Sequence, residues 1–109
     1  MADENYVKVA SLDKLPPGDM MRVKIGNHEI LLVNVDGEIH ACSDICSHQF
    51  QQLSYGDLNG AEVRCSLHGA IFNVTTGDML PGKYFEFGPI PVYEVRLDGS
   101  DILVKRPAQ

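Results

Sequence analysis

The sequence lacks any long apolar run. Its 109 residues are 44% hydrophobic, an ordinary share for a globular protein. No stretch approaches the roughly 20 apolar residues that a membrane-spanning helix needs. The acidic start, MADENYVKVASLDK, has neither the cationic nor the apolar region of a secretory signal. We therefore expect a cytoplasmic protein with no membrane span, and a chain of this length predicts a single domain.

Basic residues are also scarce. Nine lysines and arginines stand against fifteen acidic residues, which gives a formal net charge of −6. Such a surface repels the phosphates of nucleic acid and of anionic lipid, so neither is an expected partner. The same charge steers encounters with a partner that has a basic surface. We expect a monomer that meets such partners transiently.

Signatures of disulfide scaffolds and of common enzymes are missing too. Three cysteines are an odd number, and a reducing cytoplasm disfavours a disulfide framework. The scattered glycines form no phosphate-binding fingerprint, and the sequence has no Gly-x-Ser-x-Gly motif and no paired-carboxylate signature. We therefore predict no catalytic residues and a protein that is not an enzyme by itself.

Sustained helical periodicity is absent as well. Apolar and polar residues alternate in short runs instead, and this period of two predicts β-strands. Asp36-Gly37 between two such runs predicts a tight hairpin. Many short strands with frequent turns indicate an all-β fold, a small antiparallel sandwich or barrel. The predicted strands are YVKVA (6–10), MRVKI (21–25), EILLVNV (29–35), EIHAC (38–42), VYEVRL (92–97) and DILVK (101–105).

The segment from about residue 43 to 84 departs from this pattern, and we predict that it is a subdomain inserted into the basal β domain. It contains two Cys/His pairs: Cys46 with His48 and, after sixteen residues, Cys65 with His68. Residues this close in sequence can present both side chains at the tip of one turn. Two such tips make a four-ligand cage of thiolates and imidazoles, which suits zinc or the iron of an iron–sulfur cluster.

The order of the ligands bears on the metal. Zinc fingers and ribbons usually keep like ligands together, whereas each pair here joins one cysteine to one histidine. That alternation suits a binuclear cluster in which one iron takes both thiolates and the other takes both imidazoles. A structural zinc module remains the less favoured alternative. His28 and His40 have no cysteine nearby and are interpreted as structural or solvated, and Cys42 as a small core side chain.

The spacing Cys-x-His, sixteen residues, Cys-x₂-His-Gly resembles the binding motif of Rieske [2Fe–2S] proteins. The stretches LSYGDLNGAEVRC, GAIFNVTTGDML and PIPVYEVRLDGSDILV resemble the soluble Rieske ferredoxins of bacterial ring-hydroxylating dioxygenase systems. The resemblance covers the whole chain. It implies that Cys46 and Cys65 ligate an inner iron and that His48 and His68 ligate an outer iron near the surface. It also places Leu80-Pro81-Gly82 in a loop that covers the cluster.

The implied ligand set has a redox consequence. Two ferric ions, two sulfides and two thiolates sum to zero charge, so reduction is easier than in an all-cysteine cluster, and Rieske potentials lie between about −150 and +300 mV. High-potential relatives add a cysteine pair and two hydroxyl donors to sulfur. The matching residues here are Gln51, Leu67, Ala70 and Phe72, which can supply neither. We therefore predict a potential at the low end of the range.

With four saturated ligands, such a centre carries electrons and does not bind substrate. The resemblance implies a one-electron carrier between an NAD(P)H-dependent flavoprotein ferredoxin reductase and a terminal oxygenase. Many of these ferredoxins have glycine directly after the first histidine, where this chain has Gln49 followed by Phe50. This departure bears on which acceptor docks. A second hypothesis is a Rieske small subunit of a larger oxidoreductase, such as an assimilatory nitrite reductase.

Overall fold

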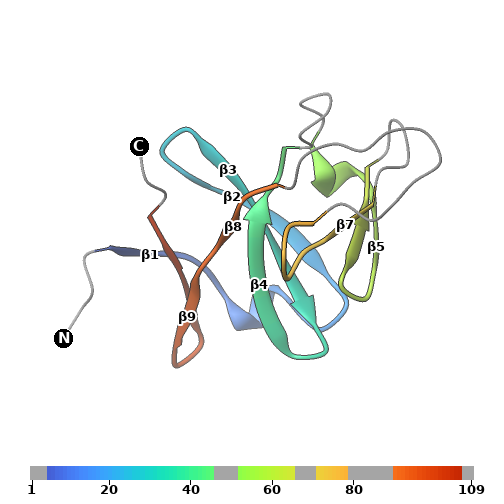
Figure 1. Ribbon diagram of the computed structural model, residues 1–109. Coiled ribbons are helices and arrows are strands. Elements are labelled where there is room, and N and C mark those ends of the chain that lie inside the picture. Colours follow the sequence, from blue (N-terminus) through green and yellow to red (C-terminus); the bar gives the residue numbers. More distant parts are fainter. Residues whose placement is uncertain (1–4, 46–51, 66–70, 79–89, 107–109) are drawn as a thin grey trace.

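The computed structural model describes residues 5–45, 52–65, 71–78 and 90–106, and their strands form three antiparallel sheets (Figure 1). The first sheet has the order β1 (Tyr6–Ser11), β10 (Asp101–Lys105), β9 (Val95–Asp98). The second has the order β2 (Met20–Ile25), β3 (His28–Val35), β4 (Glu38–Ser43), β8 (Val92–Tyr93). The third has the order β5 (Asp57–Asn59), β6 (Glu62–Arg64), β7 (Ile71–Asn73). The 3₁₀ turns are η1 (Leu12–Lys14) and η2 (Leu53–Tyr55). The predicted all-β fold is confirmed.

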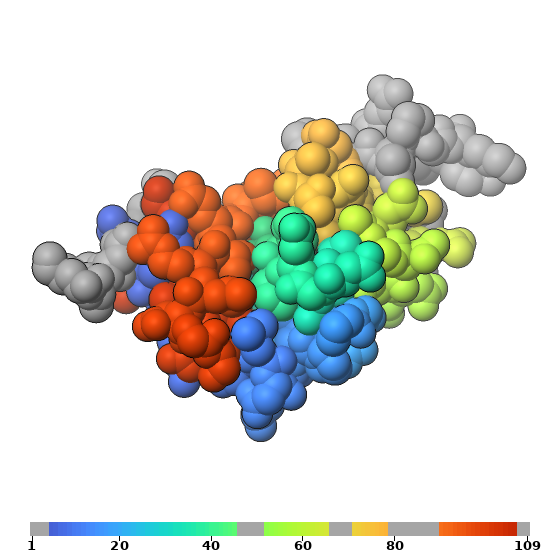
Figure 2. All heavy atoms as spheres, turned by 90° about the horizontal axis from the view of Figure 1, so that it is seen from below, coloured from blue at the N-terminus to red at the C-terminus, as the bar shows by residue number. Residues whose placement is uncertain are grey.

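The second sheet is the middle layer of the molecule. Figure 1 shows it between the first sheet, which lies near the chain termini, and the third sheet on the opposite side. In Figure 2 the strands β3 and β4 likewise separate residues 90–106 from residues 52–65. Two apolar clusters fill the spaces between layers. The basal cluster contains Leu15, Ile25, Ile30, Leu32, Ile39, Ala41, Ile102 and Val104, and the site cluster contains Leu31, Val33, Cys42, Leu53, Val63, Cys65, Phe72, Val74 and Ile90.

Strand β3 explains why a half-polar sequence can build three layers. Ile30, Leu31, Leu32 and Val33 are all fully buried. Because successive side chains of a strand point to opposite faces, Ile30 and Leu32 enter the basal cluster while Leu31 and Val33 enter the site cluster. Each such side chain contributes about 1.5–3 kcal/mol on burial. A central strand buried on both faces has a continuous apolar run in place of alternation.

The hairpin predicted at Asp36-Gly37 is confirmed. Val35 pairs with Glu38 across the turn, and both turn residues have positive φ, 52° for Asp36 and 97° for Gly37. These angles match the twist of the flanking strands. The buried Asn34 fixes the turn, because its Oδ1 accepts from the Gly37 N–H at 2.7 Å and its Nδ2 donates to the Leu15 carbonyl at 2.8 Å.

One predicted strand is divided. The run VYEVRL (92–97) was expected to form a single strand, and the structure breaks it at Glu94. Val92 pairs with Cys42 in the second sheet, whereas Val95 pairs with Val104 in the first sheet. The Glu94 carboxylate accepts from the Tyr6 hydroxyl at 2.6 Å, and its carbonyl accepts from the Lys105 N–H at 3.0 Å. The chain therefore changes sheets at this residue.

The third sheet falls inside the segment predicted as an inserted subdomain. Its strands run from Asp57 to Asn73, with residues 66–70 of that span outside the described residues. Residues 46–51 and 79–84 of the segment also lie outside them. The bounds of about 43 and 84 therefore stay a prediction.

Candidate metal centre

Cys65 is the one predicted ligand that lies within the described residues. It directly follows strand β6, is a free cysteine, and is 3% exposed. It packs in the site cluster with Val63 of the same strand and with Phe72 of β7. Its thiol is therefore at the mouth of the β6–β7 hairpin, in an apolar environment. The other predicted ligands, Cys46, His48 and His68, lie outside the described residues, as do Gln49, Phe50, Gln51, Leu67, Ala70 and Pro81.

Backbone pairing joins the residues on either side of each Cys/His pair, and each such pairing is called a closure. Ile45 forms an antiparallel bridge with Gln52, on either side of the first pair. Arg64 pairs with Ile71 in the β6–β7 hairpin, on either side of the second pair. Leu53 and Phe72, next to these closures, join Cys65 in the site cluster. The described residues therefore bring the chain on both sides of each pair into one region.

A third closure lies beside the first two. The Ile90 N–H donates to the Gly77 carbonyl at 2.8 Å, and Ile90 belongs to the site cluster. Gly77 has a φ of +82°, and a side-chain carbon there would lie 2.1 Å from the Ile90 carbonyl oxygen. Only glycine satisfies both requirements. Residues 79–89, which include Leu80-Pro81-Gly82, lie outside the described residues.

The turn η2 is fixed against the strand that ends at Cys65. Gly56 closes this turn with its N–H on the Leu53 carbonyl at 2.9 Å. A side-chain carbon at Gly56 would lie 1.8 Å from the carbonyl oxygen of Arg64. The backbones approach so closely that the position must be glycine. Residues after the first pair are therefore packed directly on the residue before Cys65.

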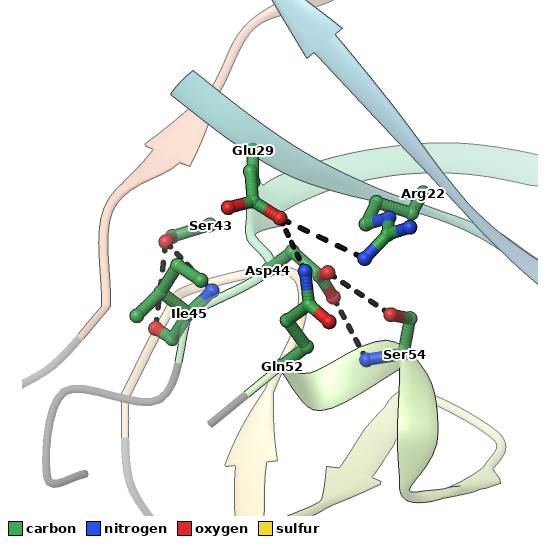
Figure 3. Close-up of polar contacts among 7 residues, drawn as sticks. All are labelled: Arg22, Glu29, Ser43, Asp44, Ile45, Gln52 and Ser54. Carbon is green, nitrogen blue, oxygen red and sulfur yellow. Dashed lines mark hydrogen bonds and ion pairs between the residues drawn. The ribbon is translucent and has the colours of Figure 1, made fainter. Parts of the chain in front are cut away.

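A buried carboxylate lies beside the first closure. Asp44 is 0% exposed, and Ser54 donates to both of its oxygens, from the backbone N–H at 2.8 Å and from the hydroxyl at 2.9 Å (Figure 3). The backbone of Asp44 is also paired, donating to the Glu29 carbonyl at 2.9 Å and accepting from Leu53 at 2.6 Å. Asp44 therefore links β3, β4 and η2 at the base of the first pair.

A second polar link lies next to it. The Gln52 side-chain amide donates to the Glu29 carboxylate, and Arg22 lies 3.7 Å from the same oxygen. Figure 3 shows dashed lines from one Glu29 carboxylate oxygen to both Arg22 and Gln52. The Ser43 hydroxyl accepts from the Ile45 N–H at 3.1 Å. These contacts hold both Ile45 and Gln52, the two residues of the first closure.

Burial changes the acid–base behaviour of two groups here. It raises the pKa of Asp44, while the hydrogen bonds from Ser54 and the charge of Arg22 oppose the rise. Burial, with a further contribution from the Asp44 charge, raises the pKa of the Cys42 thiol from its ordinary 9.0 to about 12. Cys42 therefore stays protonated and unreactive at neutral pH. Its interpretation as a small core residue is confirmed, since it is fully buried in the site cluster.

The histidines within the described residues do not form a rival metal site. His40 lies 3.2 Å from the Glu38 carboxylate in its own strand, and His28 opens β3. Across residues 5–45, 52–65, 71–78 and 90–106, no three His, Cys, Asp or Glu side chains gather as a metal site. The two Cys/His pairs stay the predicted ligands. A buried, free thiol at a hairpin mouth fits the soft, anionic ligand that iron in a cluster takes.

Sequence reasoning did not identify Asp44, Ser54, Glu29 or Gly56 as residues of this site. Asp44 follows a strand and lies two positions before Cys46. An aspartate in this sequence context fits a solvent-exposed turn as well as it fits a buried link. Only its pairing with Ser54, ten residues away, shows that it is buried. The glycine in the stretch LSYGD could have been singled out as a close backbone approach, but the partner strand cannot be read from the sequence.

No helix in the part of the chain that the structure describes is long and apolar enough to span a membrane.

Residues 5–94 match the family described as the Rieske [2Fe-2S] domain. The chain belongs to this family. The resemblance seen in the two Cys/His pairs is thereby confirmed, and a Rieske-type [2Fe–2S] cluster is its cofactor. The buried Cys65 at the hairpin mouth agrees with this cofactor.

Two kinds of relative extend the comparison. The ferredoxin component of the naphthalene 1,2-dioxygenase/salicylate 5-hydroxylase systems of Ralstonia sp. is 35% identical over 102 residues, which cover 94% of this chain and 96% of the relative. The ferredoxin of carbazole 1,9a-dioxygenase from Nocardioides aromaticivorans IC177 superposes with a TM-score of 0.87 at 31% identity, over 95% of this chain and all of that chain.

A further solved structure contains a chain of the same fold together with another protein. It is a complex of reduced oxygenase and oxidized ferredoxin in carbazole 1,9a-dioxygenase. The match has a TM-score of 0.85 at 27% identity and covers 98% of this chain and all of the matched chain. The fold of the present chain therefore occurs in an oxygenase–ferredoxin assembly.

Proposed function

We propose that this protein is a one-electron carrier that passes electrons from an NAD(P)H-dependent flavoprotein reductase to the terminal oxygenase of an aromatic-ring dioxygenase system. The observation that carries the proposal is the free, buried Cys65 at the mouth of the β6–β7 hairpin, packed against the base of the first Cys/His pair. The names of the relatives support the partner classes. Ring chemistry and choice of substrate then belong to the oxygenase, and this chain supplies no catalytic residue.

We assign the cluster ligands as Cys46 and Cys65 for one iron and His48 and His68 for the other. The cluster supplies the reversible uptake of a single electron. The chain contributes two thiolate charges, two neutral imidazoles and an apolar wall that includes Phe72. Phe72 is fully buried beside Cys65 and has no hydroxyl to donate to sulfur. This supports a potential at the low end of the Rieske range, about −150 mV.

The surface charge and the fold support transient binding to two partner proteins, the reductase and the oxygenase. A net charge of −6 favours rapid, salt-sensitive encounters with basic docking surfaces. We propose that the carrier works in the cytoplasm, as a monomer, and delivers one electron per encounter.

Iron and acid-labile sulfide content, measured on protein purified without oxygen, tests the ligand assignment. The unaltered protein should contain two irons and two sulfides per chain. Cys65→Ser should lose the cluster, whereas Cys42→Ser, the matched control in the same apolar cluster, should keep it. Stoichiometric zinc in a colourless protein would contradict the proposal and favour a structural metal site. Retention of a full cluster in Cys65→Ser would contradict the assignment of this ligand.

A further inference from the structure

A groove lies where the first sheet meets the second. Its volume is about 490 Å³, a size typical of sites for small molecules. Three segments line it: the residue that opens β3, the chain that enters and leaves β8, and the end of β10 with the residue after it. The lining residues are His28, Pro91, Val92, Tyr93, Glu94, Lys105 and Arg106. None of these residues is a predicted cluster ligand, and the electron-carrier function uses none of them.

The backbone around the groove is held at both ends of residues 91–94. The Ser43 N–H donates to the Pro91 carbonyl at 2.8 Å, which fixes the start of this segment to the second sheet. The Lys105 N–H donates to the Glu94 carbonyl at 3.0 Å, which fixes its end to the first sheet. Figure 1 shows the chain passing here from β8 to β9. The walls of the groove are therefore preformed, and a ligand can bind without ordering a loop.

Part of the lining is apolar. Val92 is 44% exposed, one of three exposed large hydrophobic residues within the part of the chain that the structure describes. Pro91 beside it is exposed as well. Tyr93 is half-buried and packs against the basal cluster, which fixes its position. A ligand with an apolar body is favoured here, because covering Val92 and Pro91 removes apolar surface from water.

The charged part of the lining is positive on balance, although the protein as a whole has a net charge of −6. Lys105 and Arg106 contribute two positive charges and Glu94 contributes one negative charge, which leaves one positive charge. The ion pairs among the described residues do not include Lys105. His28 adds a ring that can donate or accept a hydrogen bond. A single net positive charge matches a monoanion better than a dianion.

Glu94 is compatible with an anionic ligand because its carboxylate already has a partner that does not line the groove. The Tyr6 hydroxyl donates to this carboxylate at 2.6 Å. That hydrogen bond, followed by the charge of Lys105, lowers the pKa of Glu94. Glu94 thus neutralises part of the positive charge of the groove and leaves the remainder for a ligand.

We propose that this groove binds a small apolar monocarboxylate, with its apolar body on Pro91 and Val92 and its carboxylate toward Lys105 and Arg106. Arginine and lysine both donate hydrogen bonds to carboxylates, and such charge-assisted bonds are stronger than neutral ones. Benzoate is a simple member of this ligand class, since it joins one carboxylate to one rigid ring. Binding makes and breaks no covalent bond. The site adds a ligand-binding property that electron transfer by itself does not require.

The first test titrates the cluster-loaded protein with benzoate at low ionic strength, by isothermal titration calorimetry and by the amide chemical shifts of the oxidised protein. Binding should saturate at one site per chain, and the amides of Val92, Glu94 and Lys105 should shift with the same saturation curve. Acetate, which lacks the apolar body, and benzyl alcohol, which lacks the charge, should each bind about tenfold more weakly. This ligand series needs no variant, so it tests the proposal even if a substitution impairs folding.

A pair of variants then locates the site. Lys105→Gln should weaken benzoate binding by about fivefold, the upper range for an exposed ion pair. Lys24→Gln is the matched control, because it removes the same charge from an exposed residue of β2 that does not line the groove, and its affinity should equal that of the unaltered protein. Absence of saturable binding, equal losses in the two variants, or acetate or benzyl alcohol binding as tightly as benzoate would overturn the inference.

Discussion

Gly56 and Arg64 lie closer together than any residue with a side chain would allow. The carbonyl oxygen of Arg64 is 1.8 Å from the position that a side-chain carbon on Gly56 would take. The contact joins η2, which follows the first Cys/His pair, to the strand that leads into Cys65. The relative position of the two pairs therefore depends on a residue with no side chain.

Gly56→Ala should displace η2 from β6 and loosen the metal centre. Overpacking of this kind costs about 1–3 kcal/mol. Gly99→Ala is a useful control, because Gly99 has a φ of +62° but open space around it, so the variant carries backbone strain of about 1 kcal/mol without a clash. Urea denaturation of both variants and the rate of cluster release to an iron chelator give the comparison. Equal release rates would show that the close contact has no part in holding the site.

Ser54→Ala should weaken the link between Asp44 and η2. The variant loses the hydroxyl donor at 2.9 Å but keeps the backbone donor at 2.8 Å. Loss of one hydrogen bond to a buried carboxylate costs about 1.5–3 kcal/mol. Ser100→Ala, in the exposed turn before β10, removes the same hydroxyl far from this network. Thermal unfolding, followed by the visible absorption of the cluster, should show a lower midpoint for Ser54→Ala and an unchanged midpoint for Ser100→Ala. A lower midpoint for Ser100→Ala with an unchanged one for Ser54→Ala would contradict the role of Asp44 as a buried link.

Cys42 should lower the stability of the protein in alkali. Its pKa is about 12 in the fold and 9.0 ordinarily, so the folded protein keeps a proton that the unfolded chain has lost above pH 9. The stabilising contribution is therefore complete below pH 9 and decreases as the pH rises toward 12, with a slope of up to about 1.4 kcal/mol per pH unit. The free energy of unfolding of Cys42→Ala should fall less steeply over this window than that of the unaltered protein. Parallel curves would show that the thiol is not buried as described.

Electron transfer to or from this protein should slow as salt is added. The net charge of −6 attracts a basic partner surface, and about 0.1 M salt limits such attraction to a distance of about 10 Å. Stopped-flow reduction by a flavoprotein reductase of this class should give second-order rates that fall with ionic strength. Asp57→Lys, an exposed substitution in the third sheet, should flatten that dependence. Rates that rise with salt in the unaltered protein would contradict a basic docking surface.

The sequence predicted the strands well where a local pattern of apolar or turn residues determines the structure. The apolar run in β3 and the Asp36-Gly37 turn are local signals, and both agree with the structure. The change of sheet at Glu94 was missed, because alternation continues through it and only the Tyr6 hydroxyl and the Lys105 N–H mark the crossing.

The two Cys/His pairs stand out by their spacing, because metal ligands must be chemically specific, and their assignment as ligands stays a prediction. The residues that support them could not be identified in this way. Asp44 is buried by contacts with Ser54 and Glu29, which are ten and fifteen positions away in the sequence. Polarity of a side chain predicts exposure, and it takes a specific partner to overcome that tendency. Such a partner is visible only in three dimensions.

The central claim is tested most directly by electron paramagnetic resonance of the freshly purified protein before and after dithionite reduction, with an absorption spectrum of the same sample. The account predicts a red-brown protein that is silent when oxidised and, on taking up one electron, gives the low average g of a binuclear cluster with histidine ligands. A signal with the higher average g of an all-cysteine cluster, or no signal from a colourless protein that contains zinc, would contradict it.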